Sequence, residues 1–312
     1  MPTTSQKITP CLWFDSNCED AITFYTSVFP NSKINHIQRY PDGVEEGPMA
    51  GMGGKVITAV FELDGYSFQA LDGGPLFKLN PSISFMLNFD PSVDSNASEN
   101  LETLWTQLSE GGKIMMPLGE YPFSRLYGWV EDRFGVSWQL ILTNPDGELR
   151  PHFIPSLLFV GDVCGKAQEA LTYYSEVFPD SRLGTIVLWP GGMSPEVEGN
   201  VMFGEAALSG QWITAMDSAQ DHQFAFNEAI SLSVECADQA EVDHYWDLLS
   251  AVPESEQCGW LKDRFGVSWQ IVPKQLGEFM GSSDPERSAR VMTAFMSMKK
   301  FDSAALQAAY DG

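Results

Sequence analysis

The chain has 312 residues, 44% of them hydrophobic, and this length is typical of two domains with separate cores. Its 42 acidic and 18 basic residues give a formal net charge of −24, which argues against nucleic-acid and membrane partners because phosphates and anionic lipids are repelled. The N-terminal residues lack the basic and apolar regions of a signal peptide, and no apolar run is long enough to span a bilayer. We therefore expect a soluble, cytoplasmic protein. The five cysteines include no Cys-x-x-Cys pair, so neither a disulfide framework nor a thiolate zinc site is indicated.

The first half of the chain predicts two modules with the same order of elements. A strand at residues 8–14 is followed by a helix at residues 19–29, where apolar residues recur at helical spacing until Pro30. Three further strands are expected between turns rich in Gly and Pro, at residues 34–40, 55–63 and 66–71. The second module repeats this β-α-β-β-β order, with elements at residues 83–89, 101–108, 113–118 and 129–142.

Residues 144–148 form a polar, turn-rich linker, after which the order starts again with a strand at residues 154–160 and a helix at residues 167–178. The final hairpin of the first half, residues 129–140, returns almost letter for letter as residues 260–271. In both copies an Asp-Arg-Phe-Gly turn joins two apolar runs, and we interpret its Asp-Arg pair as a structural turn. So long a self-match indicates a tandem duplication.

The two copies differ mainly after their second helix. The first copy carries an excursion at residues 111–128, where the second has only residues 251–259. Long loops on a shared scaffold often carry binding differences. We therefore expect Tyr121, Phe123 and Tyr127 to form a lid over the first site.

Several motifs resemble a known family. The motifs are Leu12-Trp13-Phe14-Asp15, Val28-Phe29-Pro30, Ile83-Ser84-Phe85, Trp129 to Gln139, Ile230 to Cys236 and Cys258 to Gln270. Together they resemble the PhnB-like branch of the glyoxalase/bleomycin-resistance/dioxygenase (vicinal oxygen chelate) superfamily. The resemblance implies an α+β fold of two tandem glyoxalase-like domains. In each domain, paired β-α-β-β-β modules are expected to curl an eight-stranded sheet around a cavity. The expected boundaries are residues 1–145 and 151–275, with a C-terminal helical extension at residues 282–312.

Superfamily members with known chemistry hold a divalent metal with His and Glu side chains. Carried onto this chain, the first-strand ligand position falls on Pro10 and Pro155. The other ligand positions carry hydroxyl or amide side chains: Gln69, Ser84, Gln139, Thr214, Ser231 and Gln270. Such neutral groups are poor ligands for zinc, nickel or iron. We therefore expect no metal and no cofactor. No Gly-rich methyl-donor loop follows a first strand either.

A cavity with neutral polar and aromatic walls remains as the expected site. The side chains expected to contact a ligand are Leu12, Phe14, Gln69, Ser84, Met86, Trp129, Ser137, Gln139, Leu157, Phe159, Thr214, Ser231, Trp260 and Gln270. The aromatic residues either fill a core or stack on a planar ligand, and both interpretations stay open. Inward amides and hydroxyls favour a ligand site, because buried amides need partners that an apolar core does not offer.

Two functions follow from this pattern. The first is a metal-free binding protein that encloses a small aromatic or amphiphilic molecule. The alternative is a glyoxalase- or dioxygenase-type enzyme that acts on a small oxygenated substrate with a divalent metal whose site is not evident. The apolar side of the C-terminal helix, which begins near Ser283-Asp284-Pro285, either packs on its own domain or bridges to a second copy in a homodimer.

Overall fold

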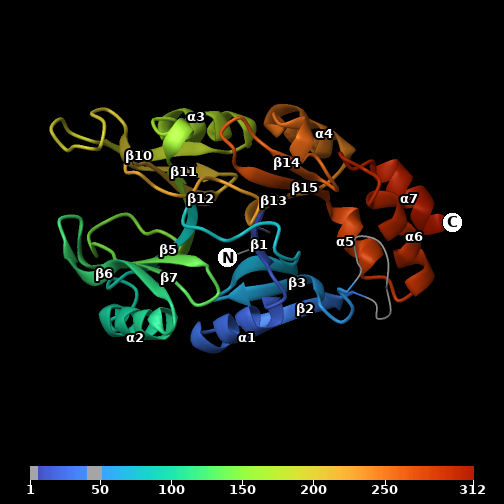
Figure 1. The fold of residues 1–312 in the computed structure, drawn as a ribbon, viewed down its shortest axis with the longest axis horizontal. Helices are drawn as coiled ribbons and strands as arrows, with labels where there is room; N and C mark the ends of the chain where they lie inside the picture. The colour runs from blue at the N-terminus through green and yellow to red at the C-terminus, as the bar shows by residue number, and fades with distance from the viewer. Residues whose placement is uncertain (1–5, 41–50) are drawn as a thin grey trace. The chain divides into compact units, whose positions relative to one another are not determined.

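The computed structural model describes residues 6–40 and 51–312 (Figure 1). Its contacts divide the chain into two compact units, one formed by Leu12–Ala229 and the other by Met1–Cys11 with Ile230–Gly312. Helices and strands are mixed along the chain, which confirms the predicted α+β class. In residues 6–40 and 51–312, no helix is both long enough and apolar enough to span a membrane.

The first module has the predicted β-α-β-β-β order. Its elements are β1 (Ile8–Phe14), α1 (Cys18–Val28), β2 (Lys33–Arg39), β3 (Val56–Leu63) and β4 (Tyr66–Asp72). Strands β2, β3 and β4 pair antiparallel, and the turn between β3 and β4 is formed by Asp64 and Gly65, both at positive φ. The buried Asp72 carboxylate accepts hydrogen bonds from the backbone N–H groups of Cys18 and Val56. This carboxylate therefore ties the start of α1 to the sheet.

The next two modules together form one sheet. Their elements are β5 (Ile83–Phe89), α2 (Ala97–Ser109), β6 (Lys113–Tyr121), β7 (Ser124–Glu131), β8 (Ser137–Leu142), β9 (Phe153–Phe159), η1 (Gly161–Val163), α3 (Ala167–Val177), β10 (Arg182–Leu188), β11 (Val201–Leu208) and β12 (Gln211–Asp217). The strand order in this eight-stranded sheet is β10-β11-β12-β9-β5-β8-β7-β6.

The centre of this sheet crosses the boundary between the two sequence copies. β5 and β9 pair antiparallel, with Ser84 opposite Ser156 and Met86 opposite Ile154. This differs from our expectation that each copy curls its own sheet. The physical reason is the short connection at residues 143–152, which lets β9 fold back beside β5 and bury both central strands. Independent folding of residues 1–145 and 151–275 as domains stays a prediction.

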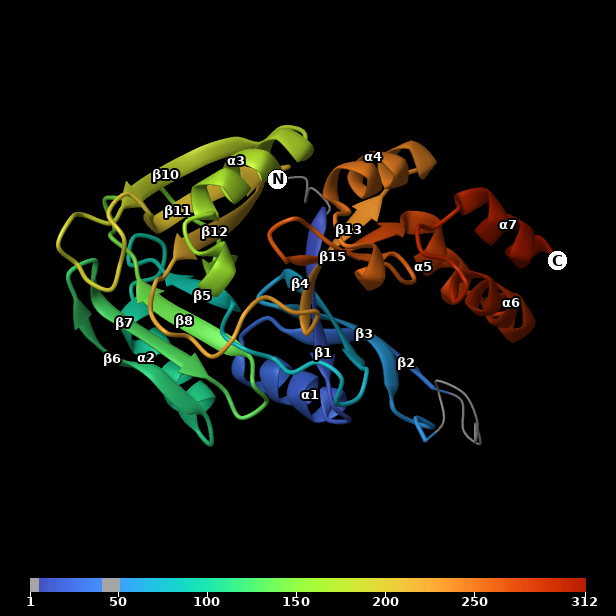
Figure 2. The ribbon, with the colours of Figure 1, turned by 45° about the horizontal axis from the view of Figure 1, so that its top comes forward.

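Both helices of this pair of modules cover the same face of the sheet. A Cβ atom on Gly128 of β7 would lie 2.5 Å from Trp105 of α2, and one on Gly204 of β11 would lie 2.8 Å from Leu171 of α3. The strand registers place these two glycines on the same face as Leu140 and Ala215. Figures 1 and 2 show α2 beside β6 and β7, and α3 beside β10 and β11. We call the opposite face of the eight-stranded sheet the inner face.

The excursion at residues 111–128 is not a loop. Most of it belongs to β6 and β7, a long hairpin that forms one edge of the sheet. The expectation of a lid over the site is therefore wrong for Tyr127, which lies on β7 and is 5% exposed. Tyr121 and Phe123 lie at the tip of the hairpin, where their rings stack at 5.7 Å.

The smaller unit holds the last module and the C-terminal extension. Its elements after β1 are β13 (Ile230–Cys236), α4 (Gln239–Leu249), η2 (Pro253–Ser255), β14 (Trp260–Lys262), β15 (Ser268–Pro273), α5 (Lys274–Met280), α6 (Pro285–Phe295) and α7 (Ser303–Asp311). β15 pairs parallel to β13 and antiparallel to β14. The C-terminal helices bury a cluster of Phe279, Val291, Phe301 and Leu306. The backbone N–H groups of Cys258 and Gly259 also donate to this extension. The extension therefore packs on its own unit.

The Asp-Arg turns have a structural role in both copies. The Asp132 carboxylate, 4% exposed, accepts hydrogen bonds from the backbone N–H groups of Phe134 and Val136 through Oδ1. Through Oδ2 it accepts from Trp138 Nε1 and Tyr25 OH, each at 2.8 Å. In the other copy the Asp263 carboxylate accepts the matching bonds from the backbone N–H groups of residues 265 and 267 and from the residue 269 indole. The repetition of the motif is thus explained without a ligand.

We expect Asp132→Asn to lower the free energy of unfolding by about 2–4 kcal/mol, because an amide replaces an oxygen that accepts two buried hydrogen bonds. Tyr25→Phe removes one of these bonds and should cost about 1 kcal/mol. Urea unfolding followed by circular dichroism measures both values. Equal stability of Asp132→Asn and the unchanged protein would contradict this role.

Candidate functional site

Four polar side chains meet at the centre of the inner face. Gln139 Nε2 lies 2.7 Å from Ser84 Oγ and 3.4 Å from Ser156 Oγ, and Thr214 lies opposite Ser156 on the neighbouring strand. We call Ser84, Gln139, Ser156 and Thr214 the polar quartet. They come from β5, β8, β9 and β12, so the β5–β9 pairing brings them together.

The amide of Gln139 is held in one orientation. The Tyr127 hydroxyl donates to Gln139 Oε1 at 2.7 Å, so the amide NH2 must point toward the two serines. Burial raises the pKa of Tyr127, which keeps its hydroxyl protonated and able to donate. Each serine oxygen accepts from the amide and still carries its own O–H hydrogen. Within the described residues, neither of these hydrogens has an acceptor.

Thr214 adds a third hydroxyl to this group. The residue is 0% exposed, and its Oγ1 atom is buried without a hydrogen-bond partner among the described residues. A buried hydroxyl without a partner costs about 1–3 kcal/mol. Three of the four side chains of the quartet are therefore hydroxyls whose own hydrogens have no acceptor among the described residues.

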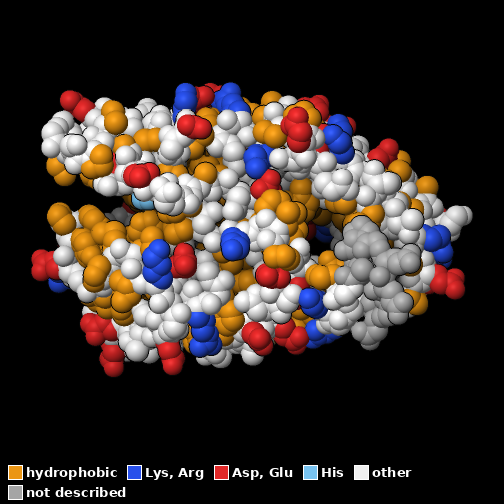
Figure 3. All heavy atoms as spheres, in the orientation of Figure 1, with side chains coloured by type: hydrophobic (Ala, Val, Ile, Leu, Met, Phe, Trp, Pro, Cys, Tyr) orange, Lys and Arg blue, Asp and Glu red, His pale blue; other side chains and the backbone are white. Residues whose placement is uncertain are grey.

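Apolar and aromatic side chains surround the quartet on the same face. Trp129 lies opposite Gln139, is partly exposed, and donates from Nε1 to Ser137 Oγ at 2.7 Å. Other partly exposed apolar side chains of this face include Met116, Ile141, Phe203, Trp212 and Met216. Figure 3 shows a hollow at the end of the molecule where β6 and β10 lie in Figure 1, with hydrophobic side chains gathered along it. The inner face thus has an apolar surface around a polar centre.

One charged pair lies beside the quartet. Glu205, 4% exposed, is opposite Thr214 and accepts from Arg150 Nε at 3.1 Å and Nη2 at 2.8 Å. The Arg150 guanidinium also stacks 4.0 Å above the ring of Trp212. Burial alone would raise the pKa of Glu205, but the bonds from Arg150 and from Thr185 N hold this pKa below its usual value. This pair was not predicted, although a Glu inside the apolar run Val201–Leu208 was a usable signal.

The structure corrects the predicted direction of several strand residues. Pro155 lies opposite Phe85 while Ser156 contacts Gln139, so the first-strand position on the inner face is Ser156. By the same alternation, Leu157 and Phe159 point to the helix-covered face. The prediction that these two residues face the cavity is therefore wrong. Met86, Trp129 and Ser137 share the inner face with Gln139, and contact of these residues with a ligand stays a prediction.

The smaller unit repeats part of this arrangement. Gln270 Nε2 donates to Ser231 Oγ at 2.9 Å. The buried Cys11 lies close enough to both side chains for them to lower the pKa of its thiol in part. Cys11 therefore takes the place that we had given to Pro10, and Leu12 and Phe14 point to the opposite face of β1. Burial raises the pKa of Cys11 to about 11, which keeps the thiol protonated at neutral pH.

Two other predicted residues, Trp260 and Gln69, lie on strands. Trp260 lies opposite Gln270 in the β14–β15 pair, and Gln69 lies on β4 opposite Val60. A role in ligand binding for these residues stays a prediction.

The polar quartet does not fit the metal that the superfamily resemblance implies. Its donors are three neutral hydroxyls and one amide whose oxygen already accepts from Tyr127. Transition metals in proteins are held by imidazole, thiolate and carboxylate groups instead. Elsewhere in the described part of the chain, no three side chains of His, Cys, Asp or Glu lie close enough together to hold a metal ion.

This architecture defines the class of the protein. Eight strands from two β-α-β-β-β modules, with helices on one face and a polar centre on the other, form the vicinal oxygen chelate fold. A sequence profile of the family described as 3-demethylubiquinone-9 3-methyltransferase matches residues 6–141 and 151–272. The chain belongs to this PhnB-like family and carries two tandem copies of its domain.

Solved structures include relatives of one copy and of the whole chain. A PhnB protein from Bacillus cereus is 41% identical and covers 44% of this chain and 100% of its own, with a TM-score of 0.39. Protein PA1353 from Pseudomonas aeruginosa is 27% identical and covers 45% of this chain and 98% of its own, with a TM-score of 0.38. Glyoxalase I from Zea mays is 13% identical over 88% of this chain and 96% of its own, with a TM-score of 0.52, and is similar in fold. A comparison with curated protein sequences finds no match.

We expect the Glu205–Arg150 pair to make the free energy of unfolding fall as the pH is lowered into the acid range. Because the folded pKa of Glu205 lies below its unfolded value of about 4.3, its contribution is present above that pH and is lost as the pH falls further. Glu205→Gln should lower the free energy of unfolding by about 2 kcal/mol at pH 7 and flatten its decline between about pH 5 and pH 3. Urea unfolding at several pH values measures this slope. The control is Glu102→Gln at an exposed position of α2, and an equal change in slope in both variants would contradict the assignment.

Proposed function

We propose that the inner face of the eight-stranded sheet binds a small aromatic or amphiphilic molecule without a metal. The observation that carries this proposal is the polar quartet, where buried hydroxyl donors face an apolar surface and one of them, Thr214, has no partner in the described structure. A carbonyl or similar oxygen of a ligand fits three O–H donors, and its apolar body fits the side chains around them. Apolar surfaces with a few placed polar groups are typical of small-molecule sites.

The proposal is for binding and not for methyl transfer, although the family description names a methyltransferase. The glycines at residues 51–54 lead into β3 and not into a helix, so they do not form a strand-to-helix loop for a methyl donor. The alternative is a metal-dependent enzyme of the glyoxalase or dioxygenase type. Cytoplasmic location, the lack of nucleic-acid and membrane partners, and homodimer formation stay predictions.

We expect Thr214→Val to weaken ligand binding about 5–10-fold, since one hydrogen bond to the ligand is worth about 1 kcal/mol. The same change should leave the free energy of unfolding equal or slightly higher, because a buried hydroxyl without a partner is removed. Two probes test this bond. Acetophenone has a carbonyl group where ethylbenzene has a methylene group, and the binding of the two can be compared by saturation-transfer NMR. Acetophenone should bind more tightly to the unchanged protein, and Thr214→Val should reduce the difference.

A matched control is available on α2. Ser109 Oγ is also buried and has no hydrogen-bond partner among the described residues, but it lies on a helix that covers the other face. Ser109→Ala should therefore change stability but not acetophenone binding. Equal binding of the two probes in every variant would contradict the proposal.

Treatment with a chelator distinguishes the two proposed functions, a metal-free binding protein and a metal-dependent enzyme. We expect protein purified without chelator to carry well below one equivalent of nickel, zinc, iron or manganese, because the quartet offers no suitable donor set. Dialysis against EDTA should leave both the melting temperature and acetophenone binding unchanged. Elemental analysis and thermal unfolding measure these outcomes. A stoichiometric transition metal whose removal abolishes binding would favour the enzyme.

A further inference from the structure

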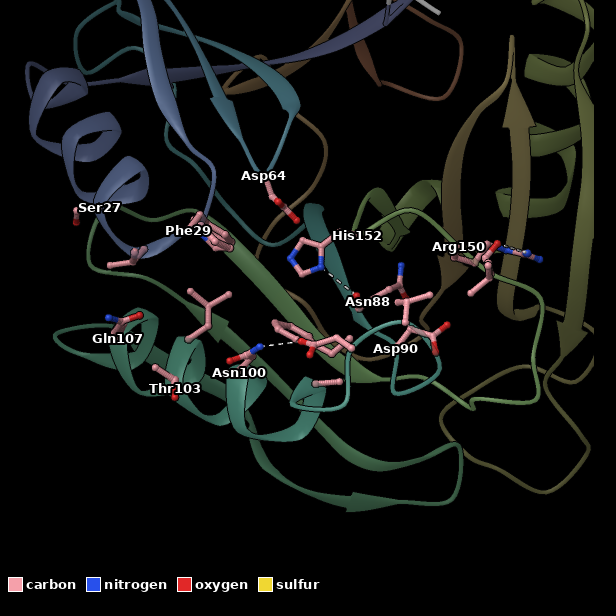
Figure 4. Close-up of a pocket in the computed structure, with 18 residues that line it drawn as sticks. Ser27, Phe29, Asp64, Asn88, Asp90, Asn100, Thr103, Gln107, Arg150 and His152 are labelled. Atoms are coloured by element: carbon pink, nitrogen blue, oxygen red, sulfur yellow. Dashed lines mark hydrogen bonds between the residues drawn. The ribbon is translucent and has the colours of Figure 1, made fainter. Parts of the chain in front are cut away.

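A pocket lies away from the polar quartet, in the larger unit. It has a volume of about 610 Å³ and lies between the end of α1, one side of α2 and the connection at residues 149–152 (Figure 4). This volume suits a small molecule, since ligand pockets typically measure about 300–1,000 Å³. The buried apolar side chains that line it are Phe29, Phe89, Ala97 and Leu104. Phe89 and Leu104 belong to the helix-covered side, so this pocket is distinct from the inner face.

His152 contributes a fixed acceptor to this pocket. Its Nδ1 lies 3.0 Å from the backbone carbonyl oxygen of Asn88, and a carbonyl can only accept, so Nδ1 carries the hydrogen. Burial lowers the pKa of His152, although the Asn88 carbonyl and the Asp64 carboxylate oppose this shift. The ring is therefore neutral at pH 7 and Nε2 is left as an acceptor. The edges of Phe89 and Phe153 pack on the imidazole at 5.0 and 4.9 Å.

Carboxylates provide the charge of the pocket. Asp64, Asp90 and Asp94 line it, and Figure 4 shows the Asp64 carboxylate directed toward His152. Of the described residues that line the pocket, Arg150 is the only Lys or Arg, and its guanidinium already pairs with Glu148 and Glu205. The pocket is thus negative, while its basic group is neutralised.

We propose that this pocket binds an organic cation, specifically a primary ammonium group on a small apolar body. The ammonium hydrogens find acceptors in the Asp64 carboxylate and in His152 Nε2, while the apolar body lies against Phe29, Phe89 and Leu104. An anion is disfavoured by three carboxylates, and a neutral molecule leaves their charge unmatched. The Asp64 carboxylate is also particular to the first copy. Asp64 lies in the turn between β3 and β4, and the equivalent turn of the second copy, between β11 and β12, carries Ser209.

The experiment uses the full chain and three probes of similar shape. These are 2-phenylethylamine, which is protonated at pH 7, the neutral 2-phenylethanol and the anionic 3-phenylpropionate. Isothermal titration should show the amine binding at least about 10-fold more tightly than the other two, a difference of about 1.4 kcal/mol. Amine binding should weaken as the salt concentration rises.

Asp64→Asn tests the residue that carries the proposal. Asn tolerates the positive φ of 47° at this turn, so the variant removes the charge and keeps the backbone. We expect amine binding to weaken about 3–10-fold, as for loss of a partly exposed charge partner. Asp180→Asn is the matched control, because Asp180 also has a positive φ of 52° but does not line the pocket.

Three results would overturn the proposal. They are equal affinity for the amine and the alcohol, no amine binding at millimolar concentration, and an equal loss of binding in Asp64→Asn and Asp180→Asn. If Asp64→Asn fails to fold, Asp90→Asn replaces it with the same expected loss. Acetophenone binding at the inner face should be unchanged by Asp64→Asn, so the two sites are tested separately.

Discussion

The pairing of β5 with β9 is the interaction on which the candidate site depends. Its register sets Ser84 opposite Ser156, and β8 and β12 then add Gln139 and Thr214 on either side. A shift of one residue in either strand would turn its side chains to the opposite face and separate the four groups. The carboxylate of Asp132 supports the same arrangement, since it fixes the hairpin that leads into β8.

The two halves of this sheet have the same topology but different chemistry. Trp129 and Glu205 occupy equivalent places, each opposite the closing-strand member of the quartet. On one side the indole and the Tyr127 ring give an aromatic surface. On the other side the Arg150 guanidinium pairs with the buried Glu205 carboxylate and stacks on the Trp212 indole. A ligand that bridges the centre would therefore contact a neutral aromatic side and an ion-paired side, and this asymmetry restricts how it can be oriented.

The sequence predicted the modules, the duplication and the role of the Asp-Arg turns, because each depends on local spacing or on direct repetition. The direction of the β9 residues was not predictable, since Phe153–Phe159 is almost wholly apolar and buried on both faces, without an alternation to anchor its register. The β5–β9 pairing and the Glu205–Arg150 ion pair each join residues that are far apart in the sequence, so the partners could not be predicted from local spacing. The β6–β7 hairpin was predicted only in part, as a strand at residues 113–118, because glycines and prolines interrupt the strand pattern beyond it.

The β5–β9 pairing joins the two sequence copies within one chain, which affects how their sequences can diverge. A polypeptide with one copy of the repeat would need two molecules to build such a sheet. The two molecules would build two equivalent sheets, so every replacement would occur in both sheets. Here both sides belong to a single molecule. Dilution cannot separate them, and a replacement in one copy is not repeated in the other copy.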